Sequence, residues 1–559
     1  MKEKLDNLLK ETINYCFEER LLKETALPEY VIEVPNNREH GHLATNLPLT
    51  LASSQKRAPR EIADVIADNF KDRDSFLSKI EIAGPGFINF TINNLEWLKL
   101  LRTILDLNSK YGSSDSGKDQ RVLVEFVSAN PTGPLHLGHG RGAALGDTIC
   151  RILDFRGYDV IREFYINDAG VQIRLLGESI YARWRQFDNP EYQFPENGYH
   201  GEYVNELASF ISKEHDLSQM DSEAAIDLCA QVGKGIMLEE IKKDLELFRV
   251  KFDVWYNESE LFSNGLVKKS LAGMKQKDEL YESDGALWIK TSKYGDDKDR
   301  VIKKKDGQYT YFASDISYHL DKYERGATKA VNLWGADHHG YINRVKSALK
   351  ASGINENWLS VLLIQLVKLW KEGQEIRMSK RAGQYVTMKD LLDEVDVDAA
   401  RFVFLTKTHD SPLDFDIDMV RKNDSDNPVY YVQYAHARIC SIFRKAESEG
   451  IDVNIGGIED ELEMLILDEE IDLIRLLTEF PGLLDNICRS YEAHKLTYYL
   501  TDLAAHFHKY FNLGTKKAEN RIISSDHRAT RARLALADSI RIVIRNGLNL
   551  LGVISPEKM

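Results

Sequence analysis

Two histidines in a glycine-containing loop are the residues of this sequence best suited to phosphoryl chemistry. His136 and His139 lie in the stretch HLGHGRG at 136–142, with Gly138 between them. Imidazole groups can stabilise charge that develops on a phosphoryl group during its transfer. Glycine lets a flat base or a phosphate approach the backbone closely. These three residues therefore predict a site for a phosphorylated ligand.

The elements that must position this loop favour the same kind of ligand. Residues 122–127 (VLVEFV) are typical of a buried strand, a helical pattern runs from 139 to 155, and 158–166 predict a second strand. At the start of a helix, free N–H groups and the positive end of the dipole attract anions. The unit thus predicts an anion site between its first strand and its helix.

A dinucleotide site is the alternative reading of the same residues. The stretch GHGRGA at 138–143 also fits the pattern G-x-G-x-x-A. That fingerprint requires its glycines directly after the strand. Gly138 follows Val127, the end of the predicted strand, by 11 residues. The spacing disfavours the dinucleotide reading, although either motif is weak when taken alone.

A second motif lies far downstream, where the stretch RMSKRAG at 377–383 follows an apolar run. Together, HLGH at 136–139 and MSK at 378–380 resemble the two signatures of class I aminoacyl-tRNA synthetases. The flanking stretches VEFVSANPTGP at 124–134 and VQYAHAR at 432–438 look like the arginyl-tRNA synthetase family, bacterial type. The resemblance covers nearly the whole chain. The family's Lys-Met-Ser-Lys word begins here with Arg377, which keeps the positive charge.

The resemblance implies an enzyme that activates arginine with ATP and Mg²⁺ to arginyl-adenylate, and then transfers arginine to the 3′ end of tRNA(Arg). It implies catalytic roles for His136, His139 and Lys380. The residues that it implies for ATP binding are Gly138, His136, His139, Met378, Ser379, Lys380 and Arg381. Those implied for arginine are Glu125, Ser128, Asn130, Tyr311 and Asp315. Those implied for tRNA are Asn36, Asn46, Tyr434, His436 and Arg438.

The chemistry of an arginine substrate fits the residues that the resemblance assigns to it, although the residues alone would predict only that an acidic group near this loop favours a cationic substrate. A guanidinium group is best bound by carboxylates and amide oxygens arranged as a fork. Tyr311 and Asp315 are four residues apart and so share one face of a helical turn. Glu125 lies in an otherwise apolar strand, where an unpaired carboxylate would be costly.

The residues assigned to tRNA have structural explanations that remain open. The stretch 35–46 is polar and typical of a solvated loop that ends in a helix N-cap. Tyr434, His436 and Arg438 lie in a long helical pattern that begins at Asn427 and Pro428. Aromatic side chains at helical spacing more often pack in a core, although they can also stack on bases.

Composition narrows the class of protein. At 559 residues the chain should divide into three or more domains. A net charge of −15 argues against a surface coated for non-specific nucleic-acid binding, so that RNA contacts must come from local basic surface. Five cysteines without a C-x-x-C pair disfavour both a zinc site and a disulfide framework. No structural metal is predicted.

The termini and apolar runs predict a cytoplasmic protein. The first residues form an acidic, amphipathic helical pattern rather than a signal peptide. The longest apolar run, at 361–370, is too short to span a bilayer. We expect no membrane contact and a monomer.

The pattern of elements predicts an α/β protein with three domains. An N-terminal α/β domain at 1–110 contains helical patterns at 1–24 and 58–71 and strand-like runs at 30–34 and 86–92. A polar linker leads to the catalytic domain at 120–396, a doubly wound parallel sheet with a helical insertion at about 186–275. From 397 to 559 strand signals disappear, which predicts a helical bundle. The resemblance implies that this bundle is the anticodon-binding domain.

Two alternative functions can be distinguished from the one that the resemblance implies. A nucleotidyltransferase of another class would give no reason for the C-terminal helical bundle. A non-catalytic, synthetase-like RNA-binding protein would not need His136, His139 and Lys380, which are all present.

Overall fold

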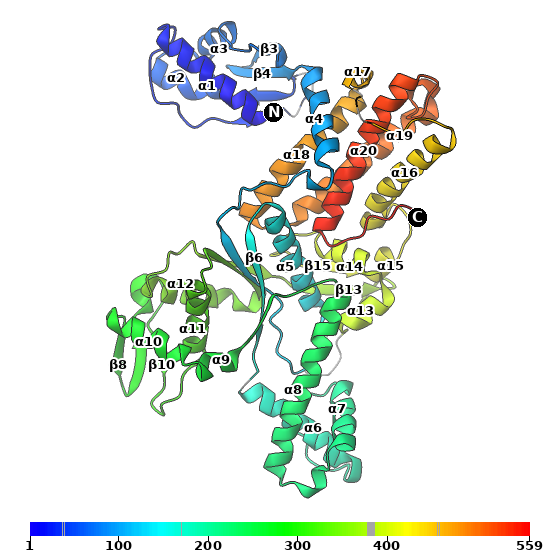
Figure 1. Ribbon diagram of the computed structural model, residues 1–559. Coiled ribbons are helices and arrows are strands. Elements are labelled where there is room, and N and C mark those ends of the chain that lie inside the picture. Colours follow the sequence, from blue (N-terminus) through cyan, green and yellow to red (C-terminus); the bar gives the residue numbers. More distant parts are fainter. Residues whose placement is uncertain (36, 38–39, 169, 377–385, 456, 458) are drawn as a thin grey trace. The chain divides into compact units, whose positions relative to one another are not determined.

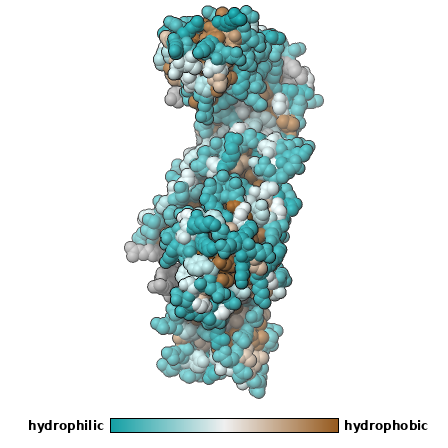
Figure 2. Space-filling view, turned by 90° about the vertical axis from the view of Figure 1, so that its left-hand side faces the viewer, coloured by the Kyte–Doolittle hydropathy of each residue, from teal (hydrophilic) through white to brown (hydrophobic). Residues whose placement is uncertain are grey.

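The computed structural model describes residues 1–559 except 36, 38–39, 169, 377–385, 456 and 458 (Figure 1). The described residues form two compact units. The first comprises 1–108, 442–478 and 509–540, and the second comprises 109–441, 479–508 and 541–559. None of the described helices has both the length and the apolar character needed to cross a bilayer. On the face drawn in Figure 2, hydrophilic residues predominate and apolar residues are scattered among them.

An antiparallel sheet with strand order β1-β2-β4-β3 forms the N-terminal part of the first unit. Its strands are β1 (Ile32–Glu33), β2 (Leu43–Thr45), β3 (Leu77–Ala83) and β4 (Phe87–Ile92), and the helices beside them in sequence are α1 (Lys2–Glu18), α2 (Leu47–Gln55), α3 (Pro59–Asp68) and α4 (Asn94–Leu107). α1 buries Leu5, Leu9 and Ile13 along one stripe. It ends before the predicted residue 24, because the chain turns at Arg20, whose φ is +58°.

The second unit is built on a five-stranded parallel sheet of order β12-β11-β5-β6-β7. The strands are β5 (Arg121–Glu125), β6 (Asp159–Ile166), β7 (Val254–Asn257), β11 (Lys329–Gly335) and β12 (Leu359–Ile364). β6 and β7 extend the sheet on one side of β5, and β11 and β12 extend it on the other. This confirms the predicted doubly wound sheet, whose ligands bind outside the carboxyl ends of the strands where the order reverses.

The two faces of β5 pack against different helices. Leu123 belongs to the core beneath α11 (Tyr311–Glu324) and α12 (Ile342–Ala351), together with Ile316 and Val345. Phe126, with the opposite side-chain parity, lies against α5 (Leu137–Phe155), where a Cβ on Gly146 would come within 2.3 Å of its ring. Glu125 therefore shares the face of Leu123 and points towards α11.

Helices interrupt the sheet after β6, as predicted. They are α6 (Val171–Asp188), α7 (Glu202–Glu214) and α8 (Ser222–Leu247), and they enclose an apolar core of their own that includes Leu176, Ile211 and Met237. The expected insertion range of 186–275 also contains α9 (Glu258–Ser263), most of α10 (Leu266–Gln276) and the strand β7, which pairs with β6 in the main sheet. An antiparallel sheet follows, formed by β8 (Leu280–Ser283), β9 (Ala286–Ile289) and β10 (Arg300–Lys303).

A small sheet and a series of helices complete the chain. The sheet has the order β14-β13-β15 and consists of β13 (Val367–Lys371), β14 (Gln374–Ile376) and β15 (Leu413–Asp416). β15 corrects the expectation that strands are absent after 397, because its four residues pair in parallel with β13. The helices are α13 (Met388–Glu394), α14 (Val397–Phe404), α15 (Ile417–Val420), α16 (Pro428–Ser448), α17 (Glu459–Leu462), α18 (Asp468–Ser490), α19 (His494–Lys516) and α20 (His527–Leu550). Short 3-10 turns occur at Asn108–Lys110, Leu217–Gln219, Thr291–Tyr294, Ala336–Tyr341 and Ala518–Asn520.

Candidate active site

The two histidines of the glycine loop form the N-terminal cap of α5. His136 Nδ1 accepts a hydrogen bond from Gly138 N at 3.1 Å, and His139 Nδ1 accepts one from His136 N at 3.2 Å. The two rings stack with their centroids 3.7 Å apart. Because each Nδ1 accepts from the backbone, the proton of each neutral ring is assigned to Nε2. Both rings therefore carry a donor at the end of a helix that already attracts anions.

Packing around two glycines of this turn is tight. A Cβ on Gly138 would lie 3.0 Å from His136 Cε1, and one on Gly140 would lie 3.3 Å from Phe404 Cε2. The first glycine thus leaves room for the stacked histidine, and the second lets α5 pack closely against α14.

The second motif follows the small sheet. Arg377, Met378, Ser379, Lys380 and Arg381 lie outside the described residues, between β14 and Thr387. Thr387 caps α13 and forms an antiparallel bridge with His136, and Met388 N donates to Leu135 O at 2.7 Å. The chain that leaves this motif is therefore hydrogen-bonded to the histidine loop.

At the carboxyl end of β5, Glu125 is buried and bonded through both oxygens. Lys322 Nζ donates to Glu125 Oε2 at 2.6 Å, and Ser128 Oγ donates to Oε1 at 3.0 Å. The costly unpaired carboxylate considered above is thus avoided by a buried ion pair. Farther along the loop, Asn130 Nδ2 donates to Gln172 Oε1 on α6 at 2.6 Å.

Asp315 lies on α11, one turn after the exposed Tyr311, as the spacing predicts. The hydroxyl of Tyr341 donates to its carboxylate. Burial raises the pKa of Asp315 to about 6, and the negative charges of Glu258 and Glu125 add to the rise. Burial, followed by the charge of Asp168, also raises the pKa of Glu258. We call Asp315, Glu258, Glu125 and Asp168 the carboxylate cluster.

The sequence reasoning missed several members of this site. Glu258 follows β7 directly, at the carboxyl end of a strand of the parallel sheet, where the ligand rule would have placed it had β7 been recognised. Lys322 belongs to the buried face of α11, together with Ile316 and His319. A lysine among residues of a buried helical face was an available signal, since lysine is seldom buried without a partner.

The residues predicted to contact tRNA differ in environment. In the first unit, Asn46 Oδ1 accepts from Val31 N at 2.8 Å, and Asn36 lies outside the described residues. In the second unit, the Arg438 guanidinium lies over the Tyr434 ring at 4.5 Å and donates to its hydroxyl at 2.9 Å. His436 is buried, and its Nδ1 is 2.8 Å from Pro556 O. Tyr434 and Arg438 are therefore paired, whereas the ring of His436 lies in the interior.

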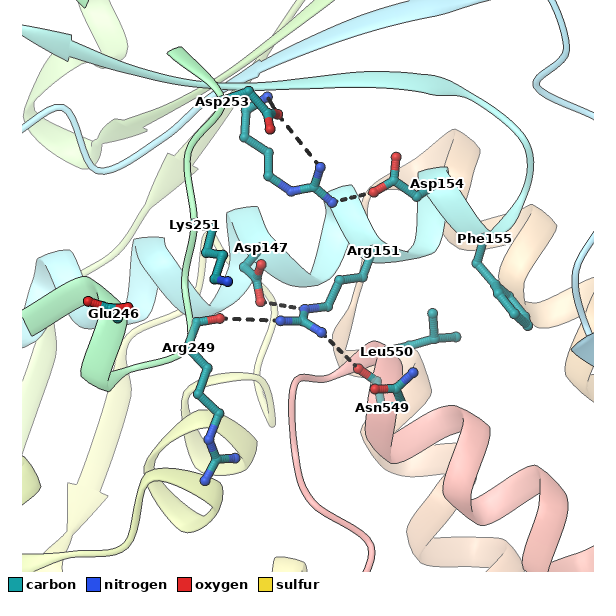
Figure 3. Close-up of a pocket in the computed structure, with 11 residues that line it drawn as sticks. Asp147, Arg151, Asp154, Phe155, Glu246, Arg249, Lys251, Asp253, Asn549 and Leu550 are labelled. Carbon is teal, nitrogen blue, oxygen red and sulfur yellow. Dashed lines mark hydrogen bonds and ion pairs between the residues drawn. The ribbon is translucent and has the colours of Figure 1, made fainter. Parts of the chain in front are cut away.

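A pocket of about 860 Å³ lies elsewhere in the second unit, between α5, the segment 246–253 and the end of α20 (Figure 3). Four acidic and four basic side chains line it, Asp147, Asp154, Glu246 and Asp253 with Arg151, Arg162, Arg249 and Lys251, and some of them form ion pairs. Arg151 Nε donates to Asp147 Oδ2 at 2.7 Å, its Nη2 donates to Arg249 O at 3.2 Å, and Arg162 pairs with Asp154. These charges balance one another, so the pocket offers no excess charge to a substrate.

Within the part of the chain that the structure describes, no group of three or more His, Cys, Asp or Glu side chains is arranged to hold a metal ion. All five cysteines are buried free thiols.

Comparisons with known proteins show the family of the chain. Family models match at residues 3–92 (arginyl tRNA synthetase N terminal domain), 101–411 (tRNA synthetases class I (R), catalytic domain) and 432–559 (DALR anticodon binding domain). The arginine–tRNA ligase of Desulfosudis oleivorans is 46% identical over 562 residues, covering 100% of both chains. That of Bacillus subtilis is 43% identical over 564 residues, covering 100% of this chain and 99% of its own. The arginyl-tRNA synthetase of Thermus thermophilus shares the fold with a TM-score of 0.75 at 23% identity, covering 99% of each chain. With its catalytic-domain match and its full-length relatives, the chain belongs to the arginyl-tRNA synthetase family.

Proposed function

We propose that the protein is an arginine–tRNA ligase, which condenses arginine with ATP to arginyl-adenylate and then transfers arginine to the 3′ end of tRNA(Arg). The observation that carries the proposal is the carboxylate cluster at the carboxyl end of β5, the strand whose following loop leads to the anion-attracting start of α5. Burial raises the pKa of both Asp315 and Glu258, as does the nearby negative charge. A cation bound among these carboxylates would relieve their mutual repulsion, and arginine supplies one.

Activation of arginine places negative charge at the start of α5. The arginine carboxylate attacks the α-phosphorus of ATP, and pyrophosphate leaves. The Nε2–H groups of His136 and His139 would donate to the α-phosphate as charge develops, and Gly138 would allow adenine to lie near the backbone. Lys380, with Met378, Ser379 and Arg381, would bind the phosphates farther from the reacting atom. Mg²⁺ would arrive with ATP, because it usually binds substrate phosphates and keeps several waters.

Arginine would bind between β5 and α11. Asp315 and Glu258 would hold the guanidinium, and Tyr311, which is 66% exposed, would cover it. Ser128 and Asn130 would hold the amino-acid end, close to the loop that leads to His136. Glu125 would fix Ser128 through the hydrogen bond between their side chains.

Binding of tRNA would use surfaces outside this site. The Arg438 guanidinium lies over the aromatic ring of Tyr434, an arrangement that suits stacking on a base. The buried His436 would stabilise α16, the helix that carries both residues. We assign Asn36 and Asn46 to a tRNA contact of the N-terminal domain. We also propose the domain limits 1–110, 120–396 and 397–559, a cytoplasmic location and a monomer.

The direct test measures tRNA charging with each of the twenty amino acids, and we expect arginine alone to be transferred. Two substitutions of His139 then test whether its Nε2–H group stabilises the α-phosphate during activation. In His139→Asn the amide oxygen can replace Nδ1 as acceptor for His136 N, but no group replaces Nε2. In His139→Gln the amide nitrogen can replace Nε2.

We expect His139→Asn to lower the charging rate about a hundredfold or more, since loss of one such donor costs about 3 kcal/mol. His139→Gln should retain more activity. The exposed His215 gives the matched control, and His215→Ala should charge at the wild-type rate. Charging of another amino acid would overturn the proposed function, and wild-type rates in both His139 variants would remove that residue from the mechanism.

A further inference from the structure

A fully buried lysine lies behind the amino-acid side of the site. Lys322 is 0% exposed, and its Nζ donates to Glu125 Oε2 at 2.6 Å and to Asn332 Oδ1 at 3.1 Å. Asn332 and Glu125 are register partners on the adjacent strands β11 and β5. One ammonium group of α11 therefore ties together the two strands between which the order of the sheet reverses.

The other carboxylate oxygen of Glu125, Oε1, accepts a hydrogen bond from a turn at residues 127–128 whose backbone is strained. Val127 and Ser128 have φ values of +69° and +41°, and a β-branched residue is a clear outlier in this region. Ser128 Oγ donates to Glu125 Oε1 at 3.0 Å and accepts from Tyr165 N at 3.2 Å. Such strain persists only where the surroundings over-determine it. The bond from Glu125 is one of the contacts that hold the turn, and the turn starts the loop that contains Asn130 and His136.

The same lysine is linked to the other side of the site. Asn332 Nδ2 is 3.0 Å from His319 Nε2, and His319 Nδ1 is 2.7 Å from Asp315 O. Burial, followed by the charge of Lys322, lowers the pKa of His319 to about 3. The ring is therefore neutral, accepts from Asn332 and donates to the backbone of Asp315. Hydrogen bonds thus run from Ser128 through Glu125, Lys322, Asn332 and His319 to Asp315.

We propose that Lys322 is a positioning residue for arginine, which acts through Glu125 and Ser128 to keep the turn at 127–128 in its binding conformation. This inference rests on the proposed function and names a residue that determines its arginine site. Lys322 does not touch the substrate. Its removal should therefore affect arginine and leave ATP binding at α5 little changed.

The neighbouring ion pair on the same helix supplies a matched control. Arg325, one turn after Lys322, donates to Glu163 Oε2 at 2.6 Å, and Glu163 is the register partner of Glu125 on β6. Glu163 also accepts from Tyr318 at 2.6 Å. Both pairs join α11 to the sheet, but only the carboxylate of Glu125 is bonded to the strained turn.

The test measures KM for arginine and KM for ATP in tRNA charging by the full-length chain. We expect Lys322→Met to raise KM for arginine on the order of a hundredfold, as small displacements of positioning groups can. KM for ATP should change by less than about twofold. Lys322→Arg, which keeps the charge, should restore most of the affinity. Arg325→Met should lower the melting temperature without raising KM for arginine.

A comparison of Glu125→Gln with the double variant Glu125→Gln/Lys322→Met tests whether Lys322 affects arginine binding through Glu125. The double variant leaves no unpaired charge at this position and so remains informative if Lys322→Met does not fold. If Lys322 acts through Glu125, the two variants should have the same KM for arginine within about twofold. A further large rise in the double variant, or an equal rise in both Michaelis constants for Lys322→Met, would overturn the inference. Failure of the wild-type chain to charge arginine would instead overturn the proposed function.

Discussion

Two groups of buried charge in the second unit differ in how they are neutralised. One joins α5, α14 and the chain after α20 around Arg401, and we call it the arginine joint. The other is the carboxylate cluster at the edge of the parallel sheet. Both are built from side chains with little exposure. In the arginine joint the Arg401 guanidinium is bonded to a carboxylate and to backbone carbonyls, whereas in the carboxylate cluster burial and like charges raise the pKa of Asp315 and Glu258.

In the arginine joint, each charge is matched by several partners. Arg401 is 0% exposed and donates to Leu551 O at 2.9 Å, to Phe248 O at 2.8 Å and to the carboxylate of Asp147. Asp147 also accepts from Arg151, at one wall of the pocket in Figure 3. A Cβ on Gly552, whose φ is +68°, would lie 2.3 Å from Arg401 Nη2. The chain end is thus shaped around the guanidinium.

In the carboxylate cluster, burial disfavours the charged forms. The pKa of Asp315 rises to about 6 and that of Glu258 rises as well, so the group has a tendency to take up protons when no cation is bound. A matched set of buried charges stabilises one arrangement of the chain, whereas surplus charge of one sign provides free energy for binding a ligand of the opposite sign. Substitutions in the arginine joint should therefore lower the stability of the fold, whereas substitutions in the carboxylate cluster should lower the affinity for arginine.

The largest effect is expected in the arginine joint. Arg401→Met should destabilise the second unit by about 3–5 kcal/mol, because it leaves the Asp147 carboxylate and two buried carbonyls short of a partner. The midpoint of urea unfolding measures this change. Arg151→Met removes a partly exposed arginine from the same carboxylate and should cost much less. If Arg401→Met instead raised KM for arginine and left the midpoint of urea unfolding unchanged, the arginine joint would not have the structural role assigned to it.

The next effect belongs to the carboxylate cluster. Asp315→Asn should raise KM for arginine on the order of a hundredfold, because it removes one charge that would bind the guanidinium. KM for ATP should remain near its wild-type value. The melting temperature should not fall, since an amide can still accept from Tyr341 and no longer adds to the repulsion. A fall in stability similar to that of Arg401→Met would show that Asp315 has a structural role instead.

The difference between the two groups also explains how far the sequence could predict them. The strand before His136 and the helix after it were predictable because their signals are local: an apolar run, a glycine loop and a helical period. Asn427 likewise caps α16 as predicted, with its Oδ1 accepting from Val429 N at 3.3 Å. Asp315 and Glu125 came from the family resemblance, and the spacing of four residues between Tyr311 and Asp315 added only that these two share one face of a helical turn. Local patterns thus located the histidine loop, whereas the resemblance located part of the carboxylate cluster.

The remaining features depend on partners distant in sequence. Lys322 and Glu125 are separated by 197 residues, and Arg401 and Asp147 by 254. Glu258 was missed because the four residues of β7 lie within a charged, mostly helical stretch, where pairing with β6 decides their conformation. The burial of His436 depends on the chain near Pro556, which no helical period reveals. Tertiary contacts, rather than local preference, determine these positions.

The smallest effect is a pH dependence that only the carboxylate cluster should show. Burial in the folded protein raises the pKa of Asp315 from its ordinary value of 3.8 to about 6, so this group is protonated in the folded chain at pH values where it is ionised in the unfolded chain. Its contribution to stability is therefore lost as the pH rises through about 6, the reverse of a salt-bridged aspartate. Arginine requires the ionised carboxylate, so its binding should follow the opposite trend and weaken as the pH falls.

For a single group with a pKa near 6, the ionised fraction falls from about nine-tenths at pH 7 to about one-tenth at pH 5, which should raise KM for arginine roughly tenfold. The charge of Glu258 contributes to the raised pKa of Asp315, and the pKa of Glu258 is itself raised by burial, so protonation of Glu258 should broaden the transition. Steady-state charging at saturating ATP and tRNA measures the profile, with KM for ATP followed in parallel. Asp315→Asn is the control, and its KM for arginine should depend less on pH than that of the wild type. If KM for arginine depended on pH equally in the wild type and in Asp315→Asn, the titrating group would be another residue. The negative charge of Asp315 would then not be the source of the affinity for arginine.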